Sequence, residues 1–198
     1  MSSRDEILRN VRAQPARAVA LPELRGEWIR YDNPYAQFAR TLESVGGRCL
    51  RVATTADVAP TLAADPKFAQ ATRIASCVPY VAGTVQLDDV ADPHDLESLD
   101  WAIVPASFGV AENGAVWATD AQLKHRVALF IVQHLAIILP AREIVPHMHA
   151  AYDRITLGES SLGIFISGPS KTADIEQSLV IGAHGPRSLT MICVDELV

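Results

Sequence analysis

Leu135-Ala136-Ile137-Ile138-Leu139 is the stretch that decides the fold, because five consecutive apolar residues form a strand that is buried on both faces. Similar short apolar runs lie at residues 48–53, 73–78, 101–105, 162–166 and 189–194. Helical patterns are predicted between them, at residues 35–45, 56–64, near Leu123, 143–155 and 173–181. This alternation predicts an α/β fold with a mostly parallel sheet flanked by helices.

The segment Gly109-Val110-Ala111-Glu112-Asn113-Gly114-Ala115-Val116-Trp117 predicts an added antiparallel hairpin. Asn-Gly between apolar runs is a strong hairpin signal, because both residues accept the positive φ of a type I′ turn. Glu112 is therefore expected at a strand end, where a rigidly held carboxylate stays open to a ligand. Such a carboxylate suits nucleophilic or general-base chemistry. A charged residue at a solvated turn is the alternative interpretation.

Residues 1–30 are expected to form an N-terminal arm, separate from a domain at residues 31–198. Ser2 or Ser3 can cap a short helix whose apolar residues share one face, namely Ile7, Leu8 and Val11. That apolar face predicts packing on the body of the protein or on a partner subunit.

Composition narrows the classes of function. The 198 residues are 49% apolar and carry a net charge of −6, with 17 scattered Lys and Arg residues, so a nucleic-acid partner is not expected. The longest apolar stretch, residues 127–140, is interrupted by Gln133 and His134 and is shorter than the roughly 20 residues of a membrane span. Without an apolar signal core near the N-terminus, a cytoplasmic location is expected.

Metal and cofactor motifs of the common kinds are not found in the sequence. The three cysteines are far apart: Cys49, Cys77 and Cys193. This spacing gives neither a zinc motif nor an iron–sulfur motif. His147 and His149 are two residues apart, which points them to different faces of a helix, so no metal site is predicted. The serine-hydrolase elbow and the dinucleotide-binding glycine motif are also missing, which leaves the cofactor unknown.

Two polar segments are expected beyond the carboxyl ends of the strands, where α/β sheets bind ligands. In the first, small residues allow backbone N–H groups to approach an anion, and a lysine adds charge. Its candidate ligand-binding residues are Ser167, Gly168, Ser170, Lys171, Thr172 and Asp174, and Gly114 of the hairpin segment is a further candidate. Asp174 and Glu176 would fall in the first turn of the predicted helix 173–181, where plain helix capping is the alternative.

The second segment is Gly182-Ala183-His184-Gly185-Pro186-Arg187. Its glycines have local explanations as a helix C-cap and a turn, but His184 and Arg187 do not. These two side chains could bind an anion together with Lys171 if the two loops meet. A solvated loop is the alternative.

The run Ser167 to Glu176 followed by Gly182 to Pro186 resembles the closing signature of the LUD-domain family, of the lactate-utilisation protein C type. Gly109 to Gly114 is similar to the other common block of that family, with Asn113 where many members carry Thr. The resemblance implies a fold like that of NagB, RpiA and the CoA-transferases. It also implies a role in the oxidation of L-lactate to pyruvate beside iron–sulfur partner proteins.

Three functions follow from these observations. The chain could be a component of a lactate-oxidising system that binds a small carboxylate or other anion. Alternatively, Ala111 to Gly114 resembles the Ser-Glu-Asn-Gly block of class I CoA-transferases. That resemblance implies Glu112 as a nucleophile, Asn113 as the residue that orients the thioester, and a Gly168 loop that takes a CoA phosphate. The third is a non-catalytic assembly or sensing protein whose arm recruits partners. Whether the chain is an enzyme stays open at this stage.

Overall fold

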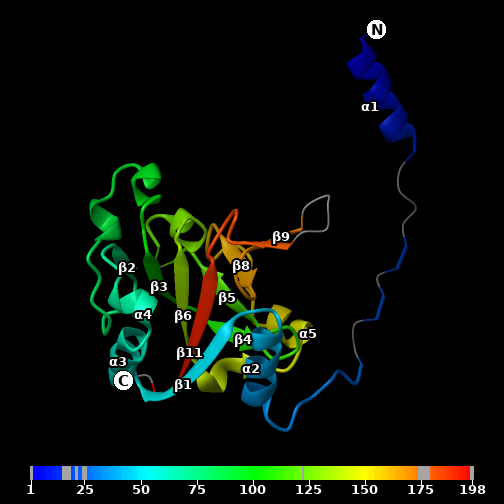
Figure 1. Ribbon diagram of the computed structural model, residues 1–198. Coiled ribbons are helices and arrows are strands. Elements are labelled where there is room, and N and C mark those ends of the chain that lie inside the picture. Colours follow the sequence, from blue (N-terminus) through cyan, green and yellow to red (C-terminus); the bar gives the residue numbers. More distant parts are fainter. Residues whose placement is uncertain are drawn as a thin grey trace.

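The computed structural model describes residues 2–14, 19–20, 22–23, 26–121, 123–173 and 179–196. Its main sheet has five strands, all of them parallel (Figure 1). In spatial order these are β1 (Arg48–Thr54), β11 (Ser188–Glu196), β6 (His134–Pro140), β3 (Trp101–Pro105) and β2 (Ile74–Ser76). The predicted α/β fold class, with a mostly parallel sheet flanked by helices, is confirmed.

Both faces of the main sheet are buried, and side chains along each strand alternate between two apolar clusters. In β6, Leu135, Ile137 and Leu139 enter one cluster, while Ala136 and Ile138 enter the other. The first cluster includes residues of α2 (Pro34–Ser44), and the second includes residues of α3 (Val58–Ala63). The short helix α4 (Pro66–Ala69) adds its aromatic residue to the second cluster. Two-sided burial explains why the central strands are continuously apolar.

A second sheet of four strands covers part of the first cluster. Its order is β7 (Ile144–Val145), β4 (Phe108–Val110), β5 (Ala115–Thr119) and β8 (Gly163–Ile166). Its inner face adds Val116 and Ile166 to the first cluster, and its outer face packs on α5 (Met148–Tyr152). The predicted hairpin is β4–β5, which pair in antiparallel fashion.

The hairpin turn differs from the predicted type I′ geometry. Val110 pairs with Ala115, so the loop contains four residues instead of two, and Gly114 N donates to Val110 O at 2.9 Å. Gly114 has φ 64°. A Cβ atom there would lie 2.7 Å from the backbone N of Leu42, so the turn is held tightly against α2. Glu112 therefore lies within the loop and not at a strand end.

Two predicted helices are mostly absent from the structure. The chain near Leu123 forms a turn followed by a 3₁₀ segment at Arg126–Leu129. In residues 143–155, Ile144 and Val145 pair with β4 as β7, and the helix is shortened to α5. Pro146 separates the strand from the helix, because proline lacks the N–H that a continuous helix would use.

The predicted helix 173–181 is wrong. Its ends belong to an antiparallel ribbon formed by β9 (Lys171–Ala173) and β10 (Leu179–Ile181), in which Ala173 pairs with Leu179. Gly182 N donates to Ser170 O at 2.9 Å and closes the base of the ribbon. Asp174 and Glu176, which were expected in the first turn of that helix, lie outside the described residues.

The N-terminal helix is α1 (Ser3–Ala13), and Ser2 forms the expected cap, completed by Asp5 as a capping box. In Figure 1, α1 stands away from the rest of the molecule. The chain reaches the body at Trp28, whose ring stacks on His149 with centroids 3.7 Å apart. In the ranges that the structure describes, no helix is long and apolar enough to cross a membrane.

Candidate functional site

The two sequence blocks that carry the family resemblance lie side by side at the end of α2. Ser167 Oγ donates to Asn113 O at 2.8 Å, which joins the loop after β8 to the β4–β5 turn. Gly168 has φ 73°, and a Cβ atom there would lie 2.7 Å from Val45 O. Glycine is thus required at both positions 114 and 168, because the backbone there passes too close to the end of α2 to leave room for a Cβ atom.

Ser170 connects the first block to the final loop. Its N–H donates to Pro186 O at 2.9 Å, and its own carbonyl accepts from Gly182 N at the same distance. A Cβ atom at Gly185 would lie 3.1 Å from Ser170 Oγ. Residues 167–170 and 182–187 therefore form one structural unit. The two loops meet, which was the condition for a shared anion site.

A pocket of about 240 Å³, here called the signature pocket, lies beside this unit. Its apolar lining residues come from β6, β8, β11 and the end of the 3₁₀ segment at Arg126–Leu129: Leu129, Phe130, Leu135, Ile164, Phe165, Ile166 and Leu189. Its polar side comes from the family signature: Ser167, Gly168, Pro169, Ser170, His184, Gly185 and Pro186. An apolar wall facing a few polar groups is the usual composition of a small-molecule site.

A second pocket, of about 400 Å³, adjoins the first and shares Phe130, His184 and Gly185 with it. Arg187 and Gln133 also line this second pocket. His184 Nδ1 lies 3.2 Å from Thr172 Oγ1, which fixes the ring between the two pockets. Among the lining residues that the structure describes, neither pocket contains Asp or Glu, and Arg187 adds a positive charge to the second pocket.

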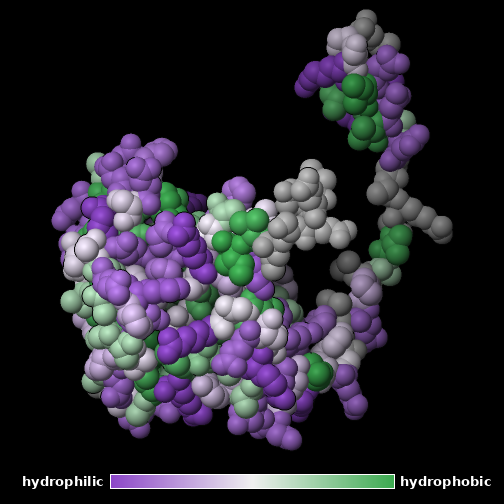
Figure 2. Space-filling view, viewed as in Figure 1, coloured by the Kyte–Doolittle hydropathy of each residue, from purple (hydrophilic) through white to green (hydrophobic). Residues whose placement is uncertain are grey.

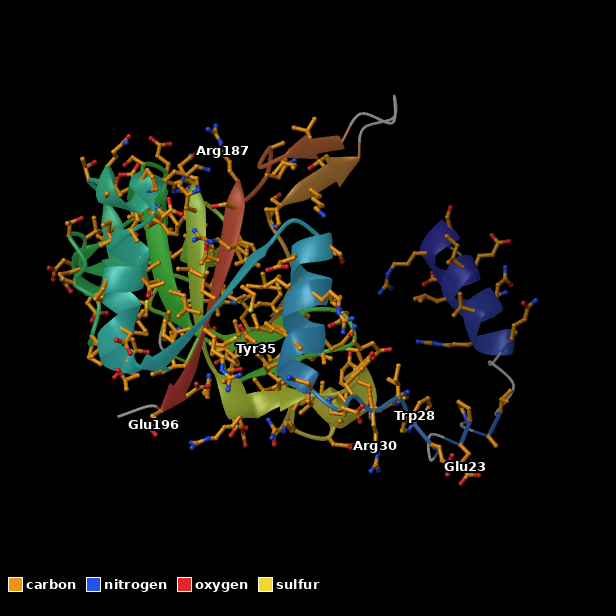
Figure 3. The ribbon with its side chains drawn as sticks, turned by 60° about the horizontal axis from the view of Figure 1, so that its bottom comes forward. Glu23, Trp28, Arg30, Tyr35, Arg187 and Glu196 are labelled. Atoms are coloured by element: carbon orange, nitrogen blue, oxygen red, sulfur yellow. The ribbon has the colours of Figure 1, made fainter. Side chains whose placement is uncertain are left out.

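The pockets lie at the amino edge of the main sheet and not at its carboxyl edge. Arg187 directly precedes the first residue of β11, at the opposite end of that strand from Glu196 (Figure 3). The expectation that both loops follow the carboxyl ends of parallel strands is therefore wrong. It failed because the first loop follows β8 of the four-stranded sheet, and the second leads into a parallel strand.

Lys171 is separated from the histidine and arginine that were expected to join it. Residues 171 and 172 are neighbours in β9, so their side chains point to opposite faces of the ribbon. Thr172 faces His184, whereas Lys171 Cε lies 3.9 Å from the position of a Cβ at Gly46, at the end of α2. The structure thus brings together five of the expected residues in the pocket linings: Ser167, Gly168, Ser170, His184 and Arg187.

Glu112 lies outside both pocket linings. Its side chain is exposed, and Oε2 accepts a hydrogen bond from Met148 N, the first residue of α5, at 2.9 Å. Glu112 N donates to Pro146 O at 3.1 Å. The neighbouring Asn113 uses Oδ1 to accept from Ala115 N within the hairpin. In this geometry Glu112 ties the hairpin turn to the start of α5.

His134, which interrupts the apolar stretch at residues 127–140, lies near the pockets. His134 Nδ1 lies 2.7 Å from Ser188 Oγ, across the first residues of β6 and β11. Burial lowers the pKa of His134, and Lys67 lowers it further, which disfavours the charged form of the ring. The apolar lining residues Leu135 and Leu189 are paired across the same strands. The parallel pairing of the first residues of β6 and β11 places His134 there, and that pairing cannot be read from the local sequence.

Cysteine and metal chemistry add little to the site. Burial and Asp88 raise the pKa of Cys77 to about 11, which disfavours a thiolate. Cys49 and Cys193 lie on adjacent strands with their Sγ atoms 3.9 Å apart. No group of three potential metal ligands occurs among the residues that the structure describes.

The fold and the signature define a class of protein. The family model for the LUD domain matches residues 66–194, and the chain belongs to this family. Relatives named lactate utilization protein C include one from Exiguobacterium sp., 31% identical over 63% of this chain and 59% of the relative. Another, from Shouchella clausii, is 36% identical over 50% of this chain and 46% of the relative.

The chain spans about half the length of the curated relatives it matches. Among solved structures, a DUF162 family protein from Deinococcus radiodurans has the same fold, with a TM-score of 0.58 at 17% identity. That match covers 81% of this chain and 96% of the other.

Proposed function

We propose that this chain acts in lactate utilisation, as a component of an L-lactate-oxidising system beside iron–sulfur partner proteins. Within that system, its own task is to bind a small carboxylate in the signature pocket. The names of its relatives support a role in lactate utilisation. The observation that carries the binding role is the convergence of Ser167, Ser170 and His184 on a pocket whose described lining contains no acidic residue.

The proposed binding mode follows from the two sides of the pocket. The carbon skeleton of a 2-hydroxy or 2-oxo acid packs on the apolar wall around Leu135 and Leu189. Its carboxylate accepts a hydrogen bond from the hydroxyl of Ser170, whose rotor adjusts to a ligand, while the Ser167 hydroxyl stays bonded to Asn113 O. Arg187 supplies positive charge from the adjoining pocket. Charge-assisted hydrogen bonds of this kind are about twice as strong as neutral ones.

The geometry favours this role over the acyl-CoA-dependent transferase. A transferase would need Glu112 and the Gly168 loop to face one ligand. Glu112 instead faces the start of α5 and lines neither pocket. We therefore assign Glu112 a positioning role in this proposal.

Growth on L-lactate as sole carbon source tests the proposal. A host lacking this gene should fail to grow, and the wild-type chain and Glu112→Gln should both restore growth. Arg187→Gln and His184→Asn should restore it poorly, whereas Lys171→Gln, a nearby basic residue outside the linings, serves as the matched control and should restore it fully. Growth of the deletion host without any copy would refute the role in lactate utilisation. Full rescue by Arg187→Gln and His184→Asn would refute the pocket.

A further inference from the structure

The outer face of the four-stranded sheet is aromatic and incompletely covered. The Trp117 and Phe165 ring centroids lie 4.7 Å apart, and those of Tyr152 and Phe165 lie 6.0 Å apart. We call these three residues the aromatic face. Trp117 and Phe165 are half-buried beneath the five-residue helix α5, and Tyr152, the last residue of that helix, is 63% exposed. Tyr and Trp are the residue types that dominate binding at protein interfaces.

Helix α1 carries a second uncovered apolar surface. Ile7, Leu8 and Val11 follow Arg4 at the spacing that places all four on one side of a helix. Ile7 is 62% exposed and Val11 is 66% exposed. Figure 2 shows these apolar side chains gathered on α1, away from the body of the protein. We call this surface the arm stripe.

The neighbours of the aromatic face can be compared with those of another exposed apolar patch. Arg4 lies within the arm stripe and Arg12 flanks it, so the stripe fits an apolar surface with acidic or aromatic neighbours. Asp153 follows Tyr152 and is exposed, while Arg154 and Arg142 both pair with Glu143, at 2.9 and 3.4 Å.

The alternative patch is Val180 and Ile181 on β10. Among its described neighbours, Lys171 pairs with Ile181 and Arg187 lies in the following loop. These two cations would repel Arg4 and Arg12. The aromatic face instead has the exposed carboxylate of Asp153 beside Tyr152.

We propose that α1 of one copy docks its arm stripe on the aromatic face of a second copy, in a reciprocal dimer. Residues 1–30 carry six Arg against four Asp or Glu, a net charge of +2, which leaves −8 for residues 31–198 of a chain that totals −6. The positively charged arm of one copy is therefore attracted to the negatively charged body of the other. Exchange of both arms is self-complementary, doubles the buried area and satisfies two-fold symmetry. This inference concerns assembly and does not depend on the proposed carboxylate binding.

Sedimentation velocity of the full chain, from micromolar to submillimolar concentration, tests the dimer. Replacing Ile7 and Val11 together by Ser removes the stripe, and Tyr152→Ser removes the most exposed part of the aromatic face. Each variant should raise the dimer dissociation constant about tenfold or more. Val180→Ser is the matched control, and it should leave the constant unchanged. A wild-type chain that stays monomeric throughout, or a dimer that neither variant weakens, overturns the proposal.

Mixing the two variants distinguishes exchange between copies from docking within one chain. The Tyr152→Ser variant keeps an intact arm, and the arm variant keeps an intact aromatic face, so one of the two contacts can form between them. The mixture should therefore associate more tightly than either variant alone. Circular dichroism and thermal unfolding of each variant check that the body is folded. A mixture that associates no better than its components shows docking within one chain and overturns the reciprocal dimer.

Discussion

The two sheets of this protein differ in how they are covered. The five-stranded sheet has an apolar cluster on each face, and Ile137, Met191 and Ile192 are fully buried. The four-stranded sheet has one buried face and one partly exposed face. Its loops also carry the hairpin turn and the first half of the signature pocket. The comparison suggests that the parallel sheet supplies stability, while the four-stranded sheet and its loops supply recognition.

The largest expected effect is on the parallel sheet. Ile137→Ala should lower the free energy of unfolding by about 2–5 kcal/mol, because it removes buried methyl groups and leaves a cavity. Tyr152→Ala on the outer face of the other sheet should cost only about 0.5 kcal/mol in the monomer. Denaturant unfolding of both variants measures the two values. Equal losses would show that both sheets contribute alike.

The hairpin turn offers a sharper test of what holds the four-stranded sheet in place. Gly114→Ala should cost about 2 kcal/mol or more, since it combines a strained positive φ with contact against Leu42. Gly158→Ala is a matched control, because Gly158 also has a positive φ but has no atom within 4 Å of the added Cβ. It should cost about 1 kcal/mol. If both variants lose the same amount, close packing on α2 contributes nothing.

Glu112 provides a smaller and more chemical test. Glu112→Ala removes the acceptor for Met148 N and should cost about 1 kcal/mol. Glu112→Gln keeps an oxygen acceptor and should cost less. Thermal unfolding of the two variants gives the difference, and an equal loss in both would mean that the charge, not the hydrogen bond, matters.

The pH dependence of stability tests the amino edge of the main sheet. The pKa of His134 is lowered in the folded protein by burial and by Lys67. The unfolded chain, with a His pKa of about 6.5, therefore binds the proton more readily than the folded chain. The contribution of neutral His134 to the free energy of unfolding is complete above the unfolded pKa, and it is lost as pH falls through the lower pKa of His134 in the folded protein. Relative to His134→Gln, the wild type should lose stability on acidification. A constant difference from pH 8 to pH 5 would contradict this account.

The parts that could be predicted from sequence are those where local patterns decide the structure. The strand Trp101–Pro105 has the predicted bounds, because a buried parallel strand is apolar throughout its length. The Ser2 cap was also predictable, since capping depends on a few adjacent residues. The ribbon β9–β10 was not predictable in this way, because its strands are three residues long and are specified by pairing with each other.

Half of the candidate site was predictable for a related reason. The polar residues Ser167, Ser170 and His184 were identified from their composition and from the family signature. The apolar wall formed by Phe130, Leu135 and Ile164 has the same pattern as ordinary core. The pairing of β6 with β11 places Leu135 beside Leu189, next to the signature residues that line the same pocket. Whether a loop lies at the amino edge or the carboxyl edge of the sheet depends on how the strands are connected and paired. The spacing of residues within the loop does not determine it.

An NMR titration of the full chain with L-lactate and with pyruvate tests carboxylate binding in the signature pocket. We expect amide shifts in residues 167–170 and 182–187, with weaker binding in Arg187→Gln and His184→Asn and unchanged binding in Lys171→Gln. Shifts confined to the Glu112 turn, or no shifts with either acid, would contradict carboxylate binding in the signature pocket.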